Sequence, residues 1–410
     1  MKVIIIGGGL AGLSAGIKLT ENNEVIILEK TNSLGGLAGS FDYKDMRIPK
    51  HYHHIFAHDY VTHKYLKNAG LFENVNWYKI KMCIAVDGKK YDFTDPISLM
   101  KFNYLSILGR VRYGLFGAYA FTFMKPSKMN DDLDALKWLN KYAGKEVTEK
   151  LFYNLYARNK FNIPLSRISA KQFANRIKAK EALGKFMYPK NGLDKMIDYM
   201  KSEFVKKGGI IKKNFEIKKI DLDNKKVNDI SYDKILVTIP IPEFLKVAKG
   251  VPFDYASRIS KVKYCPCVTV VIGTDKLLGR HYWINVFNER IHMIMQHSIL
   301  ADLYDDKISW VLRYGGSEED LDLKDGDIIE AYTAVVKKYF PEVEIKWSLV
   351  FREKYAEPVY DKDYASYMPN NKTPVEGLYF AGIATTYPKI RNMNTVLMEG
   401  ENVAELINSS

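Results

Sequence analysis

The sequence predicts an α/β fold in which a nucleotide-binding domain is assembled from separated parts of the chain and carries an inserted α+β domain. Three observations support this. An apolar strand followed by a glycine-rich turn and a helix opens the chain, and similar strand–helix pieces return near the middle and at the end. Helices and a second group of strands fill the intervals. Insertions into one parallel-sheet domain explain this alternation better than consecutive domains do.

The opening piece has the pattern of a dinucleotide fingerprint. Val3–Ile6 is an apolar run typical of a buried parallel strand, and Gly7, Gly9 and Gly12 follow with the G-x-G-x-x-G spacing. These glycines permit a tight turn, approach of the backbone to a pyrophosphate and close packing of helix on strand. A second strand, Glu24–Leu28, ends at Glu29, at the distance expected for an acid that binds a ribose 2′-OH. The sequence therefore predicts a Rossmann-like unit.

The remaining elements can be assigned in order. Hairpins are expected at 41–48, turning at Lys44-Asp45, and at 83–93, turning at Asp87-Gly88. A helical region from 97 to 181 is expected to contain helices at 99–123, 132–141, 145–156 and 170–180. Later strands are expected at 210–213, 216–220, 235–239 and 378–381, with several more between 262 and 313, and helices at 193–206, 327–339 and 394–408. The nucleotide-binding domain then comprises 1–65, 188–245 and 350–410, and the substrate domain comprises 66–187 and 246–349.

Composition narrows the class of protein. The chain has 410 residues and a formal net charge of +13, which a lysine-rich surface explains and which could also attract an anionic substrate or a membrane surface. No basic run has interleaved aromatic residues, so a nucleic-acid partner is not expected. Three cysteines without a C-x-x-C pair fit a reducing cytoplasm. The first strand begins near residue 3, so no leader peptide is expected, and no stretch reaches the ~18 apolar residues of a membrane span. The sequence does not indicate the oligomeric state.

Four motifs in order resemble the superfamily of FAD-dependent amine oxidases, protoporphyrinogen oxidases and phytoene desaturases. They are the fingerprint with Glu29, the segment Gly35-Gly36-Leu37-Ala38-Gly39-Ser40, the segment 188–193 (YPKNGL) with the strand containing Ile217, and the segment 377–382 (GLYFAG) followed by Met393-Asn394-Thr395. The resemblance implies bound FAD. The implied cofactor contacts are Gly7, Gly9, Leu10, Ala11, Gly12, Glu29, Lys30, Gly35, Gly36, Leu37, Ala38, Ile217, Gly382, Met393, Asn394 and Thr395. Two positions depart from the family pattern, because Leu37 replaces an arginine and Ile383 replaces an acidic residue.

A narrower set of segments resembles the UDP-galactopyranose mutases. Residues 50–56 (KHYHHIF) are similar to the mutase segment that carries a histidine beside the flavin, which would make His54 the catalytic candidate. Residues 156–161 resemble a substrate-side segment, with Phe161 in place of a tryptophan, and residues 387–394 resemble a tyrosine-rich loop. Phe161, Tyr387 and Arg391 are the substrate-side candidates that this resemblance implies.

Each polar candidate also has a plainer structural interpretation. His51, His53, His54 and His58 are clustered, but no carboxylate pair or thiolate joins them, so no metal site is expected. His54 could instead be a hydrogen-bonded core histidine, Arg391 a solvated loop residue, and His297 a structural histidine on a strand of the inserted sheet.

The sequence thus predicts an FAD-dependent oxidoreductase that transfers hydride from a substrate C–H bond to flavin N5. Two alternatives remain at this point: a mutase-like flavin isomerase acting on a sugar nucleotide, and a non-enzymatic lipid- or prenyl-binding module like the GDP-dissociation inhibitors. The substrate is expected to be a small molecule: a sugar nucleotide, an isoprenoid, a tetrapyrrole or an amine. The electron acceptor, whether oxygen, a quinone or another protein, is not indicated. A cytoplasmic protein with peripheral membrane contact would fit the charge.

Overall fold

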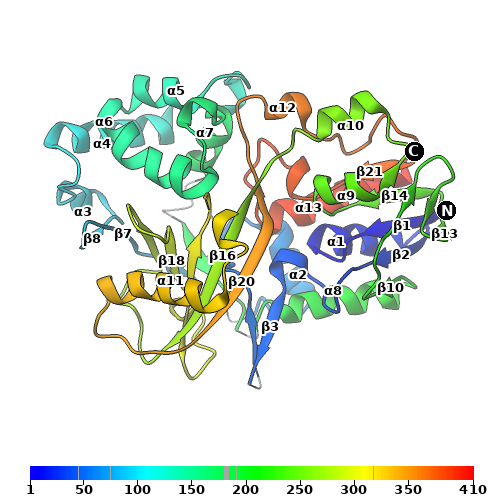
Figure 1. Cartoon of the computed structure of the whole chain (residues 1–410), viewed down its shortest axis with the longest axis horizontal. Coiled ribbons are helices and arrows are strands. Elements are labelled where there is room, and N and C mark those ends of the chain that lie inside the picture. The colour runs from blue at the N-terminus through cyan, green and yellow to red at the C-terminus, as the bar shows by residue number, and fades with distance from the viewer. Residues whose placement is uncertain (45, 74, 180–183, 191, 317) are drawn as a thin grey trace.

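The fold follows from a computed structural model that describes residues 1–44, 46–73, 75–179, 184–190, 192–316 and 318–410. Figure 1 shows a parallel sheet with its helices at one end of the molecule and a second sheet with a group of helices at the other. Asp45 of the expected hairpin turn, residues 180–181 at the end of the expected helical region, and Asn191 lie outside the described residues.

Among the described residues, one sheet is parallel throughout and is built from distant parts of the chain. In spatial order it contains β10 (Ile210–Lys212), β2 (Glu24–Leu28), β1 (Lys2–Ile6), β14 (Lys234–Val237) and β21 (Leu378–Phe380). Ile4 pairs with both Ile26 and Ile235, which fixes the register of the three central strands. The predicted discontinuous Rossmann-like domain is confirmed by this topology.

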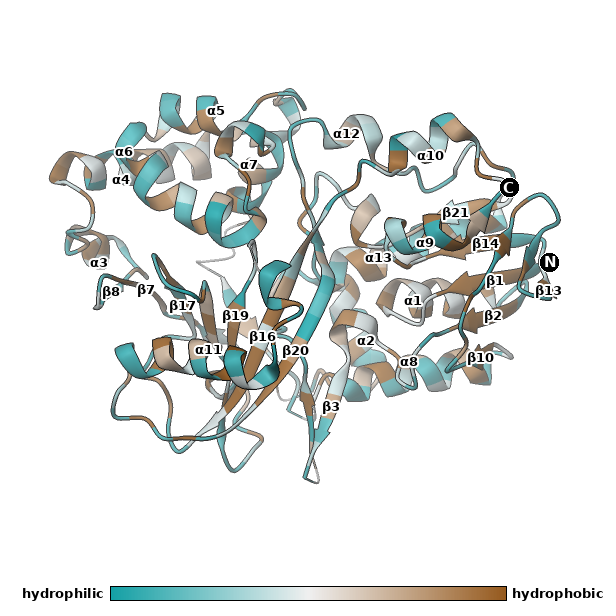
Figure 2. Ribbon diagram, in the orientation of Figure 1, coloured by the Kyte–Doolittle hydropathy of each residue, from teal (hydrophilic) through white to brown (hydrophobic). Residues whose placement is uncertain are grey.

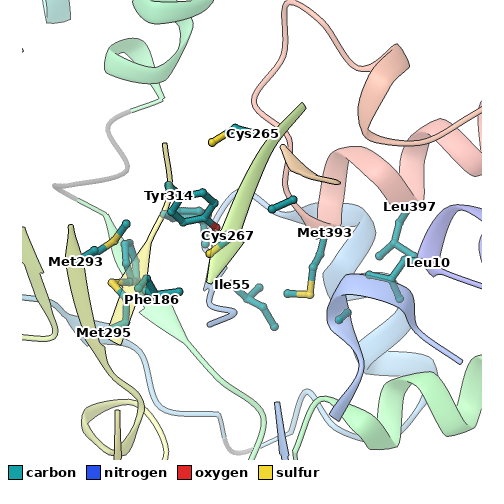
Figure 3. Packing of buried hydrophobic residues seen from close by; sticks show 14 of the residues in the cluster. Leu10, Ile55, Phe186, Cys265, Cys267, Met293, Met295, Tyr314, Met393 and Leu397 are labelled. Carbon is teal, nitrogen blue, oxygen red and sulfur yellow. The ribbon is translucent and has the colours of Figure 1, made fainter. Parts of the chain in front are cut away.

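Helices cover both faces of the parallel sheet because side chains along each strand alternate between the faces. On one face, Val3 and Ile5 belong to the core that includes α1 (Leu10–Leu19), α8 (Asp194–Lys206), α13 (Met393–Asn408) and α2 (Tyr60–Asn68). On the other, Ile4 and Ile6 pack in a core with α9 (Ile241–Val247), α10 (Phe253–Ile259) and α12 (Tyr364–Tyr367). Figure 3 shows Leu10 of α1 and Leu397 of α13 facing each other. The parallel sheet is therefore buried on both sides, as its apolar strands predict.

The second sheet contains parallel and antiparallel neighbours and lies in the half of the molecule remote from the parallel sheet. Its spatial order is β20 (Ile345–Pro358), β16 (Tyr264–Thr274), β19 (Lys307–Arg313), β18 (Met293–Gln296), β17 (Trp283–Val286), β7 (Met82–Val86) and β8 (Lys89–Asp92). Neighbours are antiparallel except β17 and β7. Asp87 and Gly88 both have positive φ, which confirms the predicted two-residue hairpin turn. Helix α11 (Asp325–Tyr339) packs on one face of this sheet (Figure 1).

The helical region differs from its prediction in two places. The expected helix at 99–123 is two helices, α3 (Pro96–Met100) and α4 (Ile107–Thr122), because Ser106 caps α4 by accepting a hydrogen bond from the Gly109 N–H. The helix expected at 145–156 is a short α6 (Lys145–Val147) that continues as a π-helical segment, η3 (Thr148–Phe161). Helices α5 (Ala135–Tyr142) and α7 (Ala170–Lys178) lie as expected.

Three further expectations are corrected. The strand predicted at 216–220 is reduced to β11 (Ile220–Asp221), so Ile217 lies in an irregular segment. The domain boundary predicted at residue 350 falls inside β20, which belongs wholly to the second sheet. His297 lies in a 3₁₀ turn after β18 rather than on a strand. The other domain boundaries stay predictions.

The remaining strands form small sheets at the edges of the two halves. They are β3 (Ser40–Tyr43) with β4 (Met46–Pro49), β5 (Ile55–Phe56) with β9 (Lys185–Met187) and β6 (Tyr78–Lys79), and β11 with β12 (Lys226–Val227), β13 (Ile230–Ser231) and β15 (Ala248–Lys249).

Candidate active site

A cavity, which we call the larger cavity, lies at the carboxyl ends of the parallel strands. It has a volume of about 300 Å³, and Gly7 after β1, Thr238 after β14 and Ala381 after β21 all line it. Ligands of open α/β sheets bind at this edge. The predicted cofactor residues in its lining are Gly7, Gly9, Leu10, Ala11, Glu29, Gly35, Gly36, Leu37, Ala38, Gly382 and Met393.

The two glycine motifs meet on this cavity. The Gly35 N–H donates to the Gly8 carbonyl at 2.9 Å, and a Cβ built on Gly9 would meet no atom nearer than the Gly36 Cα at 4.0 Å. Gly7 has a φ of +102°, which favours glycine. The bare backbone of Gly9 thus forms an open cradle in which a side chain would occupy space available to a phosphate.

Two helix N-termini face the same space. Helix α1 begins after Gly9 and has no side-chain cap, so its first N–H groups are available to an anion. Helix α13 begins after Asn392, whose side chain accepts from the Thr395 N–H at 2.8 Å. Thr395 completes this capping box, and Asn394 accepts hydrogen bonds from the N–H groups of Val61 and Thr62. The side chains of Asn394 and Thr395 therefore have structural partners, while Met393 lines the cavity.

Glu29 is held at the cavity wall by backbone groups. Its carboxylate accepts from the Gly8 N–H and the Thr31 N–H, each at 2.8 Å. The Phe215 N–H donates to the Glu29 carbonyl at 2.9 Å, so the segment containing Ile217 runs beside this acid. Lys30 and Ile217 are not among the described residues that line the cavity. Gly12 also lies outside it, and a Cβ there would stand 2.1 Å from the Gly7 carbonyl oxygen, as expected for close helix–strand packing.

A smaller chamber of about 90 Å³ adjoins the larger cavity. The two share a wall, which consists of Leu37, His53, Glu353, Arg391, Asn392 and Met393. His54 lines this chamber; its Nδ1 lies 3.0 Å from the Tyr282 hydroxyl, and its ring stacks on Phe186 with centroids 4.3 Å apart.

Of the other substrate-side candidates, one lines the two spaces and two do not. Arg391 lines both spaces. Phe161 is buried in the core, and neither it nor Tyr387 is among the described residues that line either space. The Tyr387 hydroxyl lies 2.9 Å from the Ser169 Oγ. The substrate roles of Phe161 and Tyr387 stay predictions that the cavity lining does not support.

A buried carboxylate next to the smaller chamber forms ion pairs with three cationic side chains. Glu357 of β20 is fully buried and pairs with Lys160 of η3 at 3.3 Å, with Arg391 at 2.9 Å and with Arg176 of α7. Burial alone would raise the pKa of Glu357, but Arg391, Lys160 and Arg176 outweigh it and hold the pKa at about 2. All three cations line the chamber, and Glu357 does not.

The clustered histidines engage separate partners. His51 Nδ1 lies 3.1 Å from the Thr269 hydroxyl, and His53 Nε2 lies 2.9 Å from the Leu37 carbonyl, to which it donates. Across the described part of the chain, no group of three or more His, Cys, Asp or Glu residues is arranged to hold a metal. The three cysteines are buried and free. His297 is fully buried against Tyr188 and Trp310.

Several residues of the site were not found from the sequence. Thr238, Ile239 and Pro240 follow β14, so the rule that ligands lie at strand carboxyl ends could have indicated them. No comparable sequence pattern assigns Tyr355, Glu353 or His53 to the cavity.

Burial of the histidines predicts a dependence of stability on pH. It lowers the pKa of His51, His54, His292 and His297 to about 3 and that of His53 to about 4. An unfolded chain has histidine pKa values of about 6.5, so it binds more protons than the folded protein below that pH. The free energy of unfolding should therefore be constant above about pH 6.5 and fall as the pH is lowered toward 4, by up to about 1.4 kcal/mol per pH unit for each such histidine.

Urea unfolding at about pH 7 and about pH 5.5 measures this slope, in a range where few carboxyl groups titrate. His297→Phe should flatten the slope, and His58→Phe, at an exposed position, should not. Equal stability of the unaltered protein at both pH values would contradict the prediction.

Comparison with known proteins agrees with this geometry. The model of the family "Flavin containing amine oxidoreductase" matches residues 10–408. A 15-cis-phytoene desaturase of Glycine max is 24% identical and aligns over 99% of this chain and 79% of its own. Among solved structures, a provisionally named protoporphyrinogen oxidase from Exiguobacterium sp. 255-15 and a reduced UDP-galactopyranose mutase both superpose with a TM-score of 0.78. They are 16% and 17% identical, and the alignments cover all of this chain and 98% and 94% of theirs, so they share the fold. The family match spans nearly the whole chain: the protein belongs to the flavin-containing amine oxidoreductase family and is an FAD-dependent oxidoreductase.

Proposed function

We propose that the protein oxidises a C–H bond of a small-molecule substrate held in the smaller chamber. The observation that carries this proposal is the wall that the chamber shares with the larger cavity, from Leu37 and His53 to Arg391 and Met393. When bound, FAD supplies a hydride acceptor. A substrate in the smaller chamber would lie against the flavin end of the cofactor, while the protein orients both and limits access of water.

The glycine cradle and α1 are assigned to the pyrophosphate of FAD, and Glu29 to the adenosine ribose. The open face of Gly9 and the uncapped first turn of α1 support the first assignment. Glu29 Oε1 accepts from the N–H and the hydroxyl of Thr31, whereas Oε2 accepts from the Gly8 N–H and retains a lone pair for a ribose hydroxyl. The N-terminus of α13, with Met393 in the lining, is assigned to the flavin ring.

Substitution of Gly9 tests the cofactor assignment. Gly9→Val would place a branched side chain in the cradle, so purified protein should lose most of its flavin absorbance near ~450 nm and should not recover it with added FAD. Gly326→Val, where a Cβ would meet no atom within 4 Å, is the matched control and should keep its flavin. Normal flavin content in folded Gly9→Val protein would refute the assignment.

His54 is proposed to position substrate in the smaller chamber. Burial keeps the pKa of His54 near 3, so the ring is neutral at physiological pH. Its Nδ1 is engaged by the Tyr282 hydroxyl, which leaves Nε2 as the atom able to accept or donate a hydrogen bond. A neutral imidazole suits orientation of a polar group better than charge neutralisation.

Isomerisation on a reduced flavin is the second candidate. The superposition with a UDP-galactopyranose mutase supports it, whereas Phe161 and Ile383 replace residues that such mutases use and favour net oxidation. The family match gives no support to a non-enzymatic prenyl-binding module.

Anaerobic mixing separates the two reactions. Net oxidation should bleach the oxidised flavin band on addition of a substrate, in proportion to product formed. Candidate substrates are a sugar nucleotide, an isoprenoid, a tetrapyrrole and an amine. Turnover that requires prior dithionite reduction, with no net electron transfer, would overturn the proposed oxidation in favour of isomerisation.

Peripheral contact with an anionic membrane is proposed for the face formed by α3 and α4. Apolar side chains that are 54% to 76% exposed gather there; they are Ile97, Met100, Ile107, Leu108, Val111, Leu115 and Phe123. Lys101, Arg112, Lys125 and Lys128 are exposed around them, and α4 contains no acidic residue. Figure 2 shows the apolar colour of α3 at the edge of the molecule remote from the parallel sheet. No helix in the described ranges is long and apolar enough to cross a bilayer. Apolar contacts flanked by basic residues are typical of interfacial binding.

Vesicle binding tests this surface. The protein should co-sediment with vesicles that contain phosphatidylglycerol and less with pure phosphatidylcholine. Phe123→Glu should weaken binding about tenfold or more, because a buried phenylalanine contributes roughly 1.5–3 kcal/mol. Phe253→Glu is the matched control, since Phe253 is 84% exposed on α10 and Phe123 is 76% exposed. Equal binding by both variants would contradict the assignment.

A further inference from the structure

Glu353 of β20 lies on the wall that the larger cavity and the smaller chamber share. Among the described residues it is the one carboxylate that lines the smaller chamber. The other acid in the described lining of the larger cavity, Glu29, belongs to the proposed ribose site. Arg391 and Met393 lie on the same wall as Glu353, where the proposed function places the substrate against the flavin end of the cofactor. Glu353 therefore lies where a substrate and the flavin would meet.

The carboxyl group of Glu353 has few partners within the protein. Its Oε1 accepts one long hydrogen bond, from the Tyr355 N–H at 3.3 Å, and within the described ranges its Oε2 accepts none. No described cation forms an ion pair with it, and the positive charge of Lys50 acts on it from beyond ion-pair distance. Enclosed carboxylates are ordinarily paired or accept several hydrogen bonds. Because Glu353 lines both spaces, its Oε2 is available to a ligand there.

Glu357, four residues further along the same strand, has the opposite environment. It pairs with the three cations of the buried cluster, which hold its pKa at about 2. Burial raises the pKa of Glu353, and the opposing effects of the Tyr355 N–H and of Lys50 are smaller. A carboxylate with a raised pKa is a better proton acceptor, and enzymes adjust general bases in this direction. Of the two acids, Glu353 is therefore the one suited to proton transfer.

An irregularity in the sheet separates these two acids. Cys265 of β16 pairs with Glu357 and Cys267 pairs with Glu353, so β20 has two more residues than β16 over this interval. Extra residues of this kind bend a strand and redirect its side chains, and they are common beside active sites. Glu353 lines the shared wall, whereas Glu357 is absent from the described lining of both spaces. The sheet thus presents one carboxyl group to the substrate space and buries the other.

The titratable and charged neighbours of Glu353 accept a proton less readily. They lie on the same wall, pair with Glu353 in the sheet or act on its charge; they are Lys50, His53, Cys267, Tyr355 and Arg391. Burial lowers the pKa of His53 to about 4. Burial also raises the pKa of the Cys267 thiol to about 12 and raises the pKa of Tyr355, so both keep their protons. Lys50 and Arg391 carry positive charge.

The remaining histidines of the chamber are no better suited. Burial lowers the pKa of His51 and His54 to about 3, so each is a weaker base than a histidine in water. His54 Nδ1 is in addition engaged by the Tyr282 hydroxyl. Among the described residues of the lining, Glu353 therefore combines an available oxygen with a raised affinity for a proton.

We propose that Glu353 is the general base of the oxidation and accepts the proton that leaves the substrate. The proposal rests on the proposed oxidation, because loss of two electrons breaks a C–H bond and a bond to a second hydrogen. The first hydrogen leaves with its electron pair as a hydride, for which the bound flavin supplies the acceptor. The second, on a neighbouring oxygen, nitrogen or carbon atom, passes as a proton to Glu353, and its electron pair forms the new double bond. The resulting carboxylic acid releases its proton to water.

A pH titration of FAD-loaded protein without substrate tests where Glu353 lies. A carboxyl group that ionises beside the flavin changes the local electric field, so the visible spectrum should show a transition between about pH 4 and about pH 8. Glu353→Gln should remove this transition, and Glu342→Gln, at an exposed position before β20, should keep it. Absence of the transition in unaltered protein, or its persistence in flavin-loaded Glu353→Gln protein, would overturn the proposal.

Anaerobic rapid mixing tests the chemical role. The probes are UDP-glucose, geranylgeraniol, protoporphyrinogen IX and spermidine, one from each candidate class of substrate. With the probe that reduces the flavin, Glu353→Gln should slow flavin reduction about 10²–10⁴-fold, the usual contribution of a general base. Glu353→Asp should recover part of the rate, and Glu342→Gln should reduce flavin at the unaltered rate. The rate in unaltered protein should rise with pH to a plateau as Glu353 loses its proton, and this rise should be lost in Glu353→Gln.

The results distinguish this inference from the proposed oxidation. If a probe reduces the flavin equally fast, with the same pH profile, in unaltered and Glu353→Gln protein, the oxidation stands and the general base is overturned. If no probe reduces the flavin while Glu353→Gln removes the spectral transition, the oxidation is contradicted and the base role with it, whereas the position of Glu353 beside the flavin stands. Flavin content and the thermal midpoint of each variant report folding.

Discussion

The ion cluster at Glu357 is the interaction that joins the separate parts of this protein. Glu357 comes from the second sheet, Lys160 and Arg176 from the helical region, and Arg391 from the loop that leads into α13. A fully buried carboxylate loses most of its hydration, and only several close cations can keep it ionised. Removal of Glu357 would leave three enclosed cations without their common partner. The cluster therefore fixes the second sheet and the helices relative to the helix end that faces the cofactor.

That constraint explains how two sites can share a wall. The larger cavity depends on the parallel sheet, where Gly9 and Gly35 bring two loops together and Gly400 lets α13 approach α1. A Cβ on Gly400 would stand 2.2 Å from the Ser14 hydroxyl, so the two helices pack almost backbone to backbone. The smaller chamber depends on elements outside that sheet. Arg391 and Met393 belong to both spaces, and their position is set by α13 from one side and by Glu357 from the other.

The sequence predicted best what depends on local geometry. Val3–Ile6, Gly7 and Asp87-Gly88 each lie where an apolar run or a positive φ requires them. The sequence analysis predicted one continuous helix through residues 101–106, where the structure has a break between α3 and α4. Apolar residues continue through this break, so the sequence pattern does not reveal it. It also failed to find the partners of Arg391. Lys160, Arg176 and Glu357 are far apart in the chain, and their association follows from tertiary packing that no local pattern encodes. His54 was indicated by resemblance, whereas His53, two residues after His51, is the histidine on the shared wall.

The family match identifies the class of reaction but does not identify the substrate. The features that we assign to the cofactor are the glycine loops, the acid after β2 and the two helix ends, and all of them lie on the larger cavity. Of these features, only Leu37 and the start of α13 at Asn392 and Met393 also line the smaller chamber, on the wall that it shares with the larger cavity. Most residues that line the smaller chamber lie outside the nucleotide fingerprint, on the segment 51–56, on η3, α7, β16, β17 and β20, and in the loop before α13. The residues assigned to the cofactor and most residues of the smaller chamber therefore come from different parts of this chain.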